Sequence, residues 1–222
     1  MAERREGPKF SISRVEAFTD GVFAIAATLL VLDLTTTGFG TISSNHDLWV
    51  ALGNMYPEFI AFVISFLLLC MLWVIHFRQF REIAHADTTL LWINNVRLLF
   101  VVLIPFTTSL QSEYSDFLAA RLLLPLNVLL ATLVGYFSWA WAASRGGHLL
   151  RSDVAHDLAH QSLGGLAAVI TGAAATVLAP FIGPLAFLAY AFSGLVELVL
   201  RRFRRPHAAA AKDDSASPSA EA

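Results

Sequence analysis

Six apolar stretches, each near the length needed to cross a lipid bilayer, constrain the fold of this chain more than any other feature. A transmembrane helix requires about 20 consecutive apolar residues. The stretches cover roughly residues 14–35, 49–76, 90–110, 119–143, 160–179 and 183–202. With 56% hydrophobic and 14% charged residues, the chain is far more apolar than an ordinary soluble domain. The sequence therefore predicts an all-α integral membrane protein with six transmembrane helices.

Helix-breaking residues separate the last two stretches. Pro180, Gly183 and Pro184 interrupt an otherwise continuous apolar run, and this favours a tight hairpin of two helices over one very long helix. Two further prolines, Pro105 and Pro125, lie inside the third and fourth stretches. They are expected to kink these helices rather than end them, because neighbouring helices in a membrane can satisfy the freed carbonyls.

The basic residues of the connections predict the orientation of the chain. Lysine and arginine concentrate in cytoplasmic loops. If the chain crosses the membrane six times, the N-terminal segment, the second and fourth connections and the tail lie on the same side, and they carry nearly all of the basic residues. The connections on the other side contain Arg121 alone. Both termini are therefore expected in the cytoplasm. We expect residues 1–13 to form a cytoplasmic N-terminus, 14–205 a six-helix transmembrane domain and 206–222 a disordered tail, because Ala, Ser, Asp and Pro dominate that tail without periodicity.

Composition and motifs argue against several functions. A net charge of -2 at pH 7 disfavours a nucleic-acid partner, because nucleic-acid surfaces need an excess of Lys and Arg. The one cysteine, Cys70, lies inside an apolar stretch and can form neither an intrachain disulfide nor a multi-cysteine metal site. No glycine-rich phosphate loop, GxSxG or HExxH motif occurs in the sequence. We therefore expect no enzymatic activity, no metal site and no cofactor.

The first apolar stretch carries an acid near each end, Asp20 and Asp33. Ser13 with Glu16 three residues later has the pattern of a capping box, which predicts that a helix begins at about Arg14. At about 100° per residue, one stripe of that helix contains Phe18, Ile25, Thr28, Leu29, Leu32 and Thr36. Asp20 falls on the opposite side and Asp33 on the flank. Such a stripe also fits packing or lipid contact, so periodicity alone does not define a pore.

The string RVEAFTDGVFAIAATLLVLDL, residues 14–34, resembles the first helix of the transmembrane protein 175 family of potassium-permeable channels. Two further strings agree with that family, LWVIHFRQFREI at 72–83 and LLWINNVRLLFVVLIPFTTSL at 90–110. The last three stretches carry no matching motif, so the resemblance covers about half of the chain. It implies a homotetramer of six-helix subunits in the cell membrane, with the first helix of each subunit lining a pore.

The resemblance also implies roles for the residues of the stripe. The family's narrowest point, five residues after the motif aspartate, corresponds to Ile25, and its further apolar ring positions correspond to Leu29 and Leu32. The threonine implicated in potassium preference corresponds to Thr28. The expected function is passive conduction of potassium, with monovalent cations as permeant ions and a hydrophobic constriction as the gate. The expected partners are further copies of the chain and the lipid bilayer.

A set of polar residues is expected to support that helix. In the family, the motif around the aspartate forms a structural knot with the following helices, and this implies the set Arg14, Phe18, Thr19, Asp20, Trp73, His76, Asn94 and Asn95. The family's serine is replaced by Thr19, which keeps the hydroxyl and adds a methyl group. Asp20 is interpreted as a folding latch, with a role in gating as the alternative.

The outer end of the helix is less determined. Asp33 and Thr36 are expected near the pore mouth. Asp33 would form a fourfold acidic ring if it turned inward, or would cap the interface with a neighbouring helix if it stayed on the flank.

Two other functions compete with the channel. A secondary transporter could use Asp20 or His76 for proton coupling, but transporters favour a broken helix or an inverted repeat near the midplane, and neither is evident in the first half of the chain. A non-conducting membrane scaffold is the other alternative.

Overall fold

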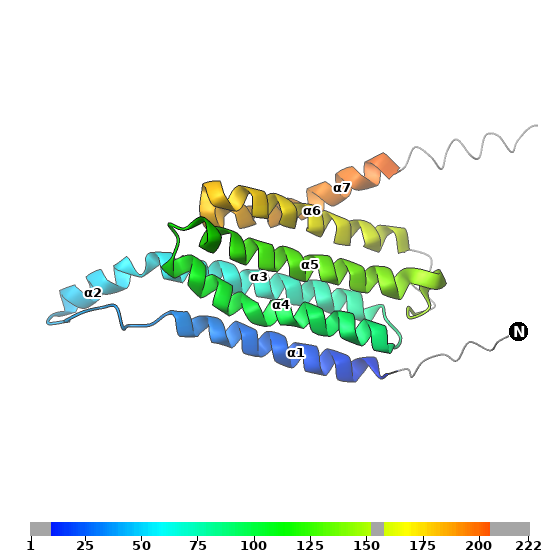
Figure 1. Ribbon diagram of the computed structural model, residues 1–222, viewed down its shortest axis with the longest axis horizontal. Coiled ribbons are helices and arrows are strands. Elements are labelled where there is room, and N and C mark those ends of the chain that lie inside the picture. Colours follow the sequence, from blue (N-terminus) through cyan, green and yellow to red (C-terminus); the bar gives the residue numbers. More distant parts are fainter. Residues whose placement is uncertain (1–9, 152–157, 205–222) are drawn as a thin grey trace, which may run out of the picture.

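The computed structural model describes residues 10–151 and 158–204, and these residues form a bundle of long helices that lie side by side (Figure 1). The long helices are α1 (Ile12–Leu29), α3 (Tyr56–Arg81), α4 (Thr88–Glu113), α5 (Leu118–Gly147) and α6 (Leu158–Ile182). Two shorter elements, the 3-10 helix η1 (Leu30–Asp33) and the helix α2 (Asn45–Asn54), lie between α1 and α3. After α6 the 3-10 helix η2 (Gly183–Phe192) leads to the final helix α7 (Ser193–Arg204).

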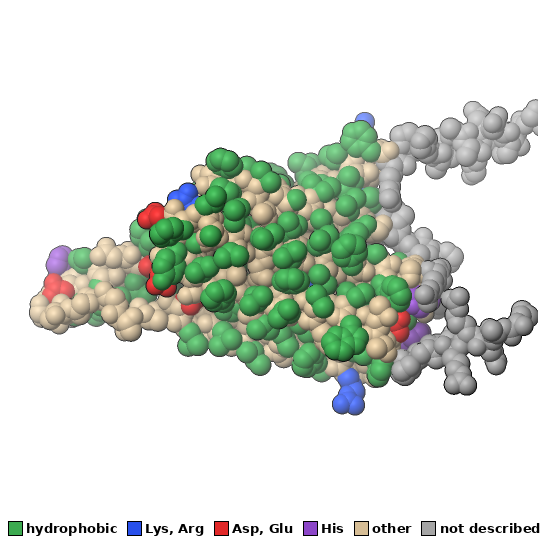
Figure 2. Space-filling model, in the orientation of Figure 1, with side chains coloured by type: hydrophobic (Ala, Val, Ile, Leu, Met, Phe, Trp, Pro, Cys, Tyr) green, Lys and Arg blue, Asp and Glu red, His purple; other side chains and the backbone are tan. Residues whose placement is uncertain are grey.

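Five described segments are long and apolar enough to cross a membrane. They are Ile12–Asp33, Tyr56–Arg81, Thr88–Glu113, Leu118–Ser144 and Ser162–Tyr190. Hydrophobic side chains cover the middle of the visible face, and charged ones lie mainly toward its two ends (Figure 2). The expectation of an all-α membrane protein is therefore confirmed.

The expected sixth stretch, 183–202, differs from a regular transmembrane helix. It divides into η2 and α7, and the fifth candidate segment runs from α6 into η2. The chain turns at Gly183, whose φ of 57° lies in the left-handed region that suits glycine. This turn confirms the predicted break between two helical pieces. From there η2 and α7 return alongside α6 toward the end of the bundle where α1 begins (Figure 1).

The two ends of the first helix correct the sequence prediction. The helix begins at Ile12, and the Ser13 hydroxyl contacts the Ser11 hydroxyl at 2.7 Å, so the predicted capping box is wrong. At the other end the α-helix gives way to η1. Each residue of a 3-10 helix advances about 120° rather than 100°. The helix stops at Asp33, and Thr36 therefore lies in the loop that follows instead of on the stripe.

One face of α1 packs against its own bundle. The buried residues of α1 and η1 are Val15, Thr19, Phe23, Ala26 and Leu30, and their spacing of three or four keeps them on one side of the helix. Phe23, Ala26 and Leu30 join a core that α3, α4 and α5 share in the middle of the bundle. Val15 joins a second core at the end where α1 begins.

The segment that follows η1 projects beyond the bundle as α2 (Figure 1). The Ser44 hydroxyl caps this helix by accepting a hydrogen bond from the Asp47 amide at 3.1 Å. Hydrogen bonds from Ser43 to the Asp47 carboxylate lower the pKa of that side chain. Every residue of α2 is exposed or half-buried.

The one-sided packing of α1 makes a prediction for two adjacent residues. Leu30 is 0% exposed, whereas Val31 is 50% exposed. Replacing Leu30 with Ala should lower the free energy of unfolding by about 2–5 kcal/mol, because a cavity remains among α1, α3 and α4. Val31→Ala should change it by about 0.5 kcal/mol or less. Thermal unfolding in detergent measures both, and equal losses would contradict the packing described.

Candidate functional site

The predicted stripe of α1 is the part of the helix that its own bundle leaves uncovered. Ile25 is 62% exposed, Leu29 40% and Leu32 66%. Phe18 and Thr28 are exposed on the same side. These residues share the side of α1 that faces away from α3 and α4. A large apolar surface of this kind in a membrane protein is available to lipid or to another copy of the chain.

The hydroxyl of Thr28 is oriented by its own helix. Thr28 Oγ1 donates a hydrogen bond to the Ile25 carbonyl at 2.8 Å. A threonine hydroxyl has one hydrogen to donate and two acceptor lone pairs. Because the hydrogen is directed to the backbone, the oxygen of Thr28 remains able to accept from water or to contact a cation.

The side chains of Leu32 and Asp33 point to different surroundings at the C-terminal end of the helix. Both line a cavity of about 600 Å³, together with Glu58, Ser109 and Glu113 from α3 and α4. Leu32 also stays exposed, whereas Asp33 is half-buried in this cavity. The tighter turn of η1 accounts for the difference, since it rotates Asp33 toward α3 and α4. Thr36 is exposed in the following loop.

Two hydrogen bonds attach the motif of α1 to the next helices. The Trp73 indole nitrogen donates to Asp20 Oδ1 at 2.8 Å, and the Asn94 amide donates to Thr19 Oγ1 at 3.0 Å. The Thr19 contact is buried, while the Asp20 carboxylate is exposed on the outside of the single chain. The structure thus brings Thr19, Asp20, Trp73 and Asn94 together in pairs. Arg14, Phe18 and Asn95, which were expected in the same set, are exposed.

His76 belongs to a different contact, centred on Arg97. Arg97 is 1% exposed, and its Nη1 lies 3.2 Å from His76 Nδ1 and 2.9 Å from Gln79 Oε1. The His76 ring also packs against Phe80, with ring centroids 4.0 Å apart. Sequence reasoning found no partner for Arg97 and missed Gln79. The signal for Gln79 was its position three residues after His76, which places both on one side of α3.

Gly135 makes room for the buried guanidinium. A Cβ atom at this glycine of α5 would lie 2.9 Å from Arg97 Cζ. The sequence contained no sign of this contact, because Arg97 and Gly135 meet only when α4 packs against α5.

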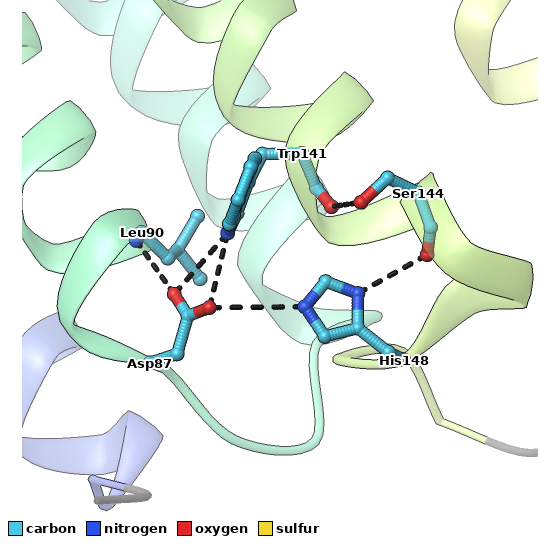
Figure 3. Close-up of polar contacts among 5 residues, drawn as sticks. All are labelled: Asp87, Leu90, Trp141, Ser144 and His148. Carbon is cyan, nitrogen blue, oxygen red and sulfur yellow. Dashed lines mark hydrogen bonds and ion pairs between the residues drawn. The ribbon is translucent and has the colours of Figure 1, made fainter. Parts of the chain in front are cut away.

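A polar cluster outside the predicted set lies at the end of the bundle where α1 begins (Figure 3). Asp87 precedes α4, and its Oδ1 accepts a hydrogen bond from the Leu90 amide at 2.7 Å. Its carboxylate also accepts from the Trp141 indole at 3.1 Å, and Oδ2 lies 3.7 Å from Nε2 of His148. An aspartate directly before a helical apolar pattern is a typical N-cap, and this signal could have identified Asp87.

Comparison with known proteins agrees with this architecture. A family profile described as "Endosomal/lysosomal potassium channel TMEM175" matches residues 14–105, which include α1, α3 and most of α4. A potassium channel from Streptomyces collinus is 37% identical over 142 residues, 61% of this chain and 66% of that protein. One from Chamaesiphon minutus is 39% identical over 116 residues, 49% of this chain and 54% of that protein. The chain spans less than two thirds of the length of both relatives.

A solved structure matches over nearly its whole length. The crystal structure of a lysosomal potassium-selective channel TMEM175 homolog from Chamaesiphon minutus superimposes with a TM-score of 0.59 at 29% identity, covering 86% of this chain and 95% of that one. The fold is that of a multi-pass α-helical membrane protein. Within that class, the chain is similar to the TMEM175 family of potassium channels, most clearly over residues 14–105. This is a family of channels and not of enzymes.

The Arg97 contact makes a prediction for Gly135. Gly135→Ala should lower the free energy of unfolding by about 1–3 kcal/mol, because the new methyl group overlaps the guanidinium and displaces either the buried Arg97 side chain or the two helices. Thermal unfolding of the purified protein measures this loss. Gly53→Ala on α2 is the matched control, since a Cβ there meets nothing within 4 Å. The contact would be contradicted if the two variants unfolded alike.

Proposed function

We propose that this chain is a potassium-permeable channel that conducts K⁺ passively across the cell membrane as a homotetramer, with α1 of each subunit lining the pore. The uncovered stripe of α1 carries the proposal. Ile25 and Leu32 are more than half exposed on one side of a helix whose other side is buried. The relatives named as potassium channels support the choice of ion.

A second observation favours association of several copies. The Asp20 carboxylate bonds to Trp73 yet stays exposed on the outside of the single chain. A charged carboxylate facing lipid at mid-membrane costs about 2.5–3.5 kcal/mol on insertion scales. A neighbouring subunit that covers this side of α1 would remove that contact with lipid. In this arrangement Asp20 supports the pore helix from behind, together with Thr19, Trp73 and Asn94, and it is not a pore-lining group.

The apolar stripe would act as both constriction and gate. Rings of Ile25, Leu29 and Leu32 force an ion to shed water or to stretch its hydration shell. Potassium holds water less tightly than sodium and therefore crosses at lower cost. A narrow apolar ring can also close the pore by dewetting. The oriented oxygens of four Thr28 side chains would add favourable contacts for the ion. Asp33 and Thr36 lie beyond the constriction, near the proposed mouth.

The proposed topology has six crossings and two cytoplasmic termini. The return of η2 and α7 along α6 supplies the sixth crossing, and the basic residues at the end of α7 satisfy the positive-inside rule. The proposed segments are a cytoplasmic N-terminus at 1–13, the channel domain at 14–205 and a disordered tail at 206–222. Residues 1–9 and 205–222 lie outside the described part of the chain.

Flux measurement with the purified full-length chain in liposomes tests the function. A potassium gradient alone should drive rapid, electrogenic efflux, as expected of a channel. Strict dependence on a proton gradient would replace the proposal with a secondary transporter that uses Asp20 or His76. The absence of flux would favour a non-conducting scaffold. Native mass spectrometry of the same sample should give a tetramer, and a monomer would contradict the pore arrangement.

Thr28 is expected to contribute to ion preference. Thr28→Val keeps the shape of the side chain and removes the oxygen, so the potassium-to-sodium permeability ratio should fall, by about tenfold or less if each lost contact is modest. The reversal potential under mixed-ion conditions measures this ratio. Thr35→Val is the control, because Thr35 is exposed and its hydroxyl contacts Thr37 in the loop after η1. An unchanged reversal potential in Thr28→Val would remove Thr28 from the filter.

A further inference from the structure

Backbone hydrogen bonds hold the start of the pore helix at one end of the bundle. Phe10, two residues before α1, donates to the Ala86 carbonyl at 2.8 Å, and the Ala86 amide donates back to the Phe10 carbonyl at 3.2 Å. The same connection between α3 and α4 is bonded to the segment after α5, where the Ala84 amide donates to the Leu149 carbonyl at 2.8 Å. The connection 82–87 therefore joins the beginning of α1 to the end of α5.

Asp87 follows Ala86 and fixes this connection to two helices. Its carboxylate caps α4 through the Leu90 amide and accepts the Trp141 indole hydrogen from α5 (Figure 3). Ala86 and Leu90 also belong to the core at this end of the bundle, together with Val15 of α1. A change at Asp87 is thus transmitted to the first turn of α1 through one residue of backbone and a shared apolar core.

The protonation of His148 decides whether it adds to this attachment. His148 Nδ1 lies 3.1 Å from the Ser144 carbonyl, which can only accept, so Nδ1 carries a hydrogen. In the neutral ring Nε2 then has a lone pair and faces the Asp87 carboxylate at 3.7 Å without a hydrogen bond. As long as Nδ1 keeps its hydrogen, the ring carries one on Nε2 only when it is protonated. Histidine side chains generally change charge between about pH 5 and pH 8.

Other charged or titratable groups lie on the same connections. Glu82 pairs with Arg81 at 3.4 Å, and the Arg151 amide bonds to the Glu82 carbonyl at 3.0 Å. His85 is half-buried in the loop before Asp87. Among the described residues, Asp87 is the charged group recorded within ion-pair distance of the His148 ring.

We propose that Asp87 is a positioning residue for the pore helix, and that protonation of His148 tightens its hold on the beginning of α1. At low pH the Nε2–H group of the imidazolium faces Asp87 Oδ2 and adds an ion pair to the attachment. At high pH the ring is neutral and the ion pair with Asp87 is absent. The role in conduction depends on the proposed function, whereas the pH-dependent attachment itself does not.

Hydrogen exchange of the full-length protein in lipid nanodiscs tests the attachment. The informative peptides cover residues 10–19 and 86–90, and each variant is compared with wild type at the same pH, so that the intrinsic pH dependence of exchange cancels. His148→Asn places an amide where Nδ1 lies and nothing where Nε2 lies. Asp87→Asn keeps one acceptor oxygen for the Leu90 amide and for the longer Trp141 contact at 3.3 Å, but it lacks the charge and the second acceptor. Asp87→Ala lacks both.

The variants distinguish the effect of the ion pair between His148 and Asp87 from the effect of the cap that Asp87 provides for α4. At about pH 6, His148→Asn and Asp87→Asn should exchange faster than wild type at residues 10–19, by about twofold to fivefold, as expected for a partly exposed ion pair. At about pH 8 His148→Asn and wild type should coincide. Asp87→Ala should exchange faster at both pH values. Ser44→Ala, which removes the cap of α2, should affect α2 alone and without pH dependence.

Several outcomes would overturn the proposal. A loss of protection of equal size at both pH values in His148→Asn would make His148 a packing residue. Unchanged protection of residues 10–19 in Asp87→Ala would remove the positioning role of Asp87.

Potassium flux of the same proteins separates this inference from the proposed function. The wild-type flux should differ between the two pH values. In His148→Asn the ratio of the two fluxes should be closer to one. Absence of wild-type flux, with the exchange pattern intact, would reject the channel and retain the attachment. Normal flux without a pH-dependent difference in exchange would retain the channel and reject the pH-dependent attachment.

Discussion

Lipid offers no hydrogen-bond partner, and the polar groups of this chain are arranged around that constraint. Hydroxyls on the helices donate to carbonyls of the preceding turn, as Thr132 does to Val128 at 2.8 Å and Thr171 to Ala167 at 3.0 Å. Longer polar side chains meet across helices, as Arg97 meets Gln79. Unsatisfied polar groups in the hydrocarbon cost several kcal/mol each. The helices can therefore pack in few ways, and the position of α1 follows from these pairs as much as from apolar burial.

That position divides α1 into surfaces with different partners. The buried side, from Val15 to Leu30, matches α3 and α4. The stripe around Ile25 is exposed among the described residues of its own chain, and Asp20 lies on a further side, next to Trp73 and a groove of about 340 Å³ lined by residues of α1 and α3. A helix that was only an anchor would need one packed side and one lipid side. The exposed carboxylate of Asp20 makes a purely lipid-facing surface unfavourable, and this is the physical reason for assigning that side to a second copy.

The sequence predicted these surfaces correctly where the backbone is a regular α-helix. Steps of 100° grouped Phe18, Ile25 and Leu29 correctly on one face because residues 12–29 are α-helical. The same steps misplaced Thr36, because the backbone tightens at Leu30 and leaves the helix after Asp33. Ser13 looked like a cap, yet the helix starts earlier at Ile12. Contacts between distant segments had no local pattern: nothing near Arg97 pointed to Gly135, and nothing near Asp87 pointed to Trp141.

The helix α4 contacts α1, α3 and α5 through the polar groups described above. It holds α1 at two levels, through Asn94 bonded to Thr19 and, nearer its own beginning, through the connection that ends at Asp87. About one turn after Asn94, Arg97 fixes α4 to α3, and Gly135 lets α5 approach the same guanidinium. A displacement of α4 along its axis would strain all of these contacts together, because each joins a different neighbour. The first helix is therefore positioned by a bundle that resists small shifts, and a change in α4 reaches α1 either through the contact of Asn94 with Thr19 or through the connection 82–87.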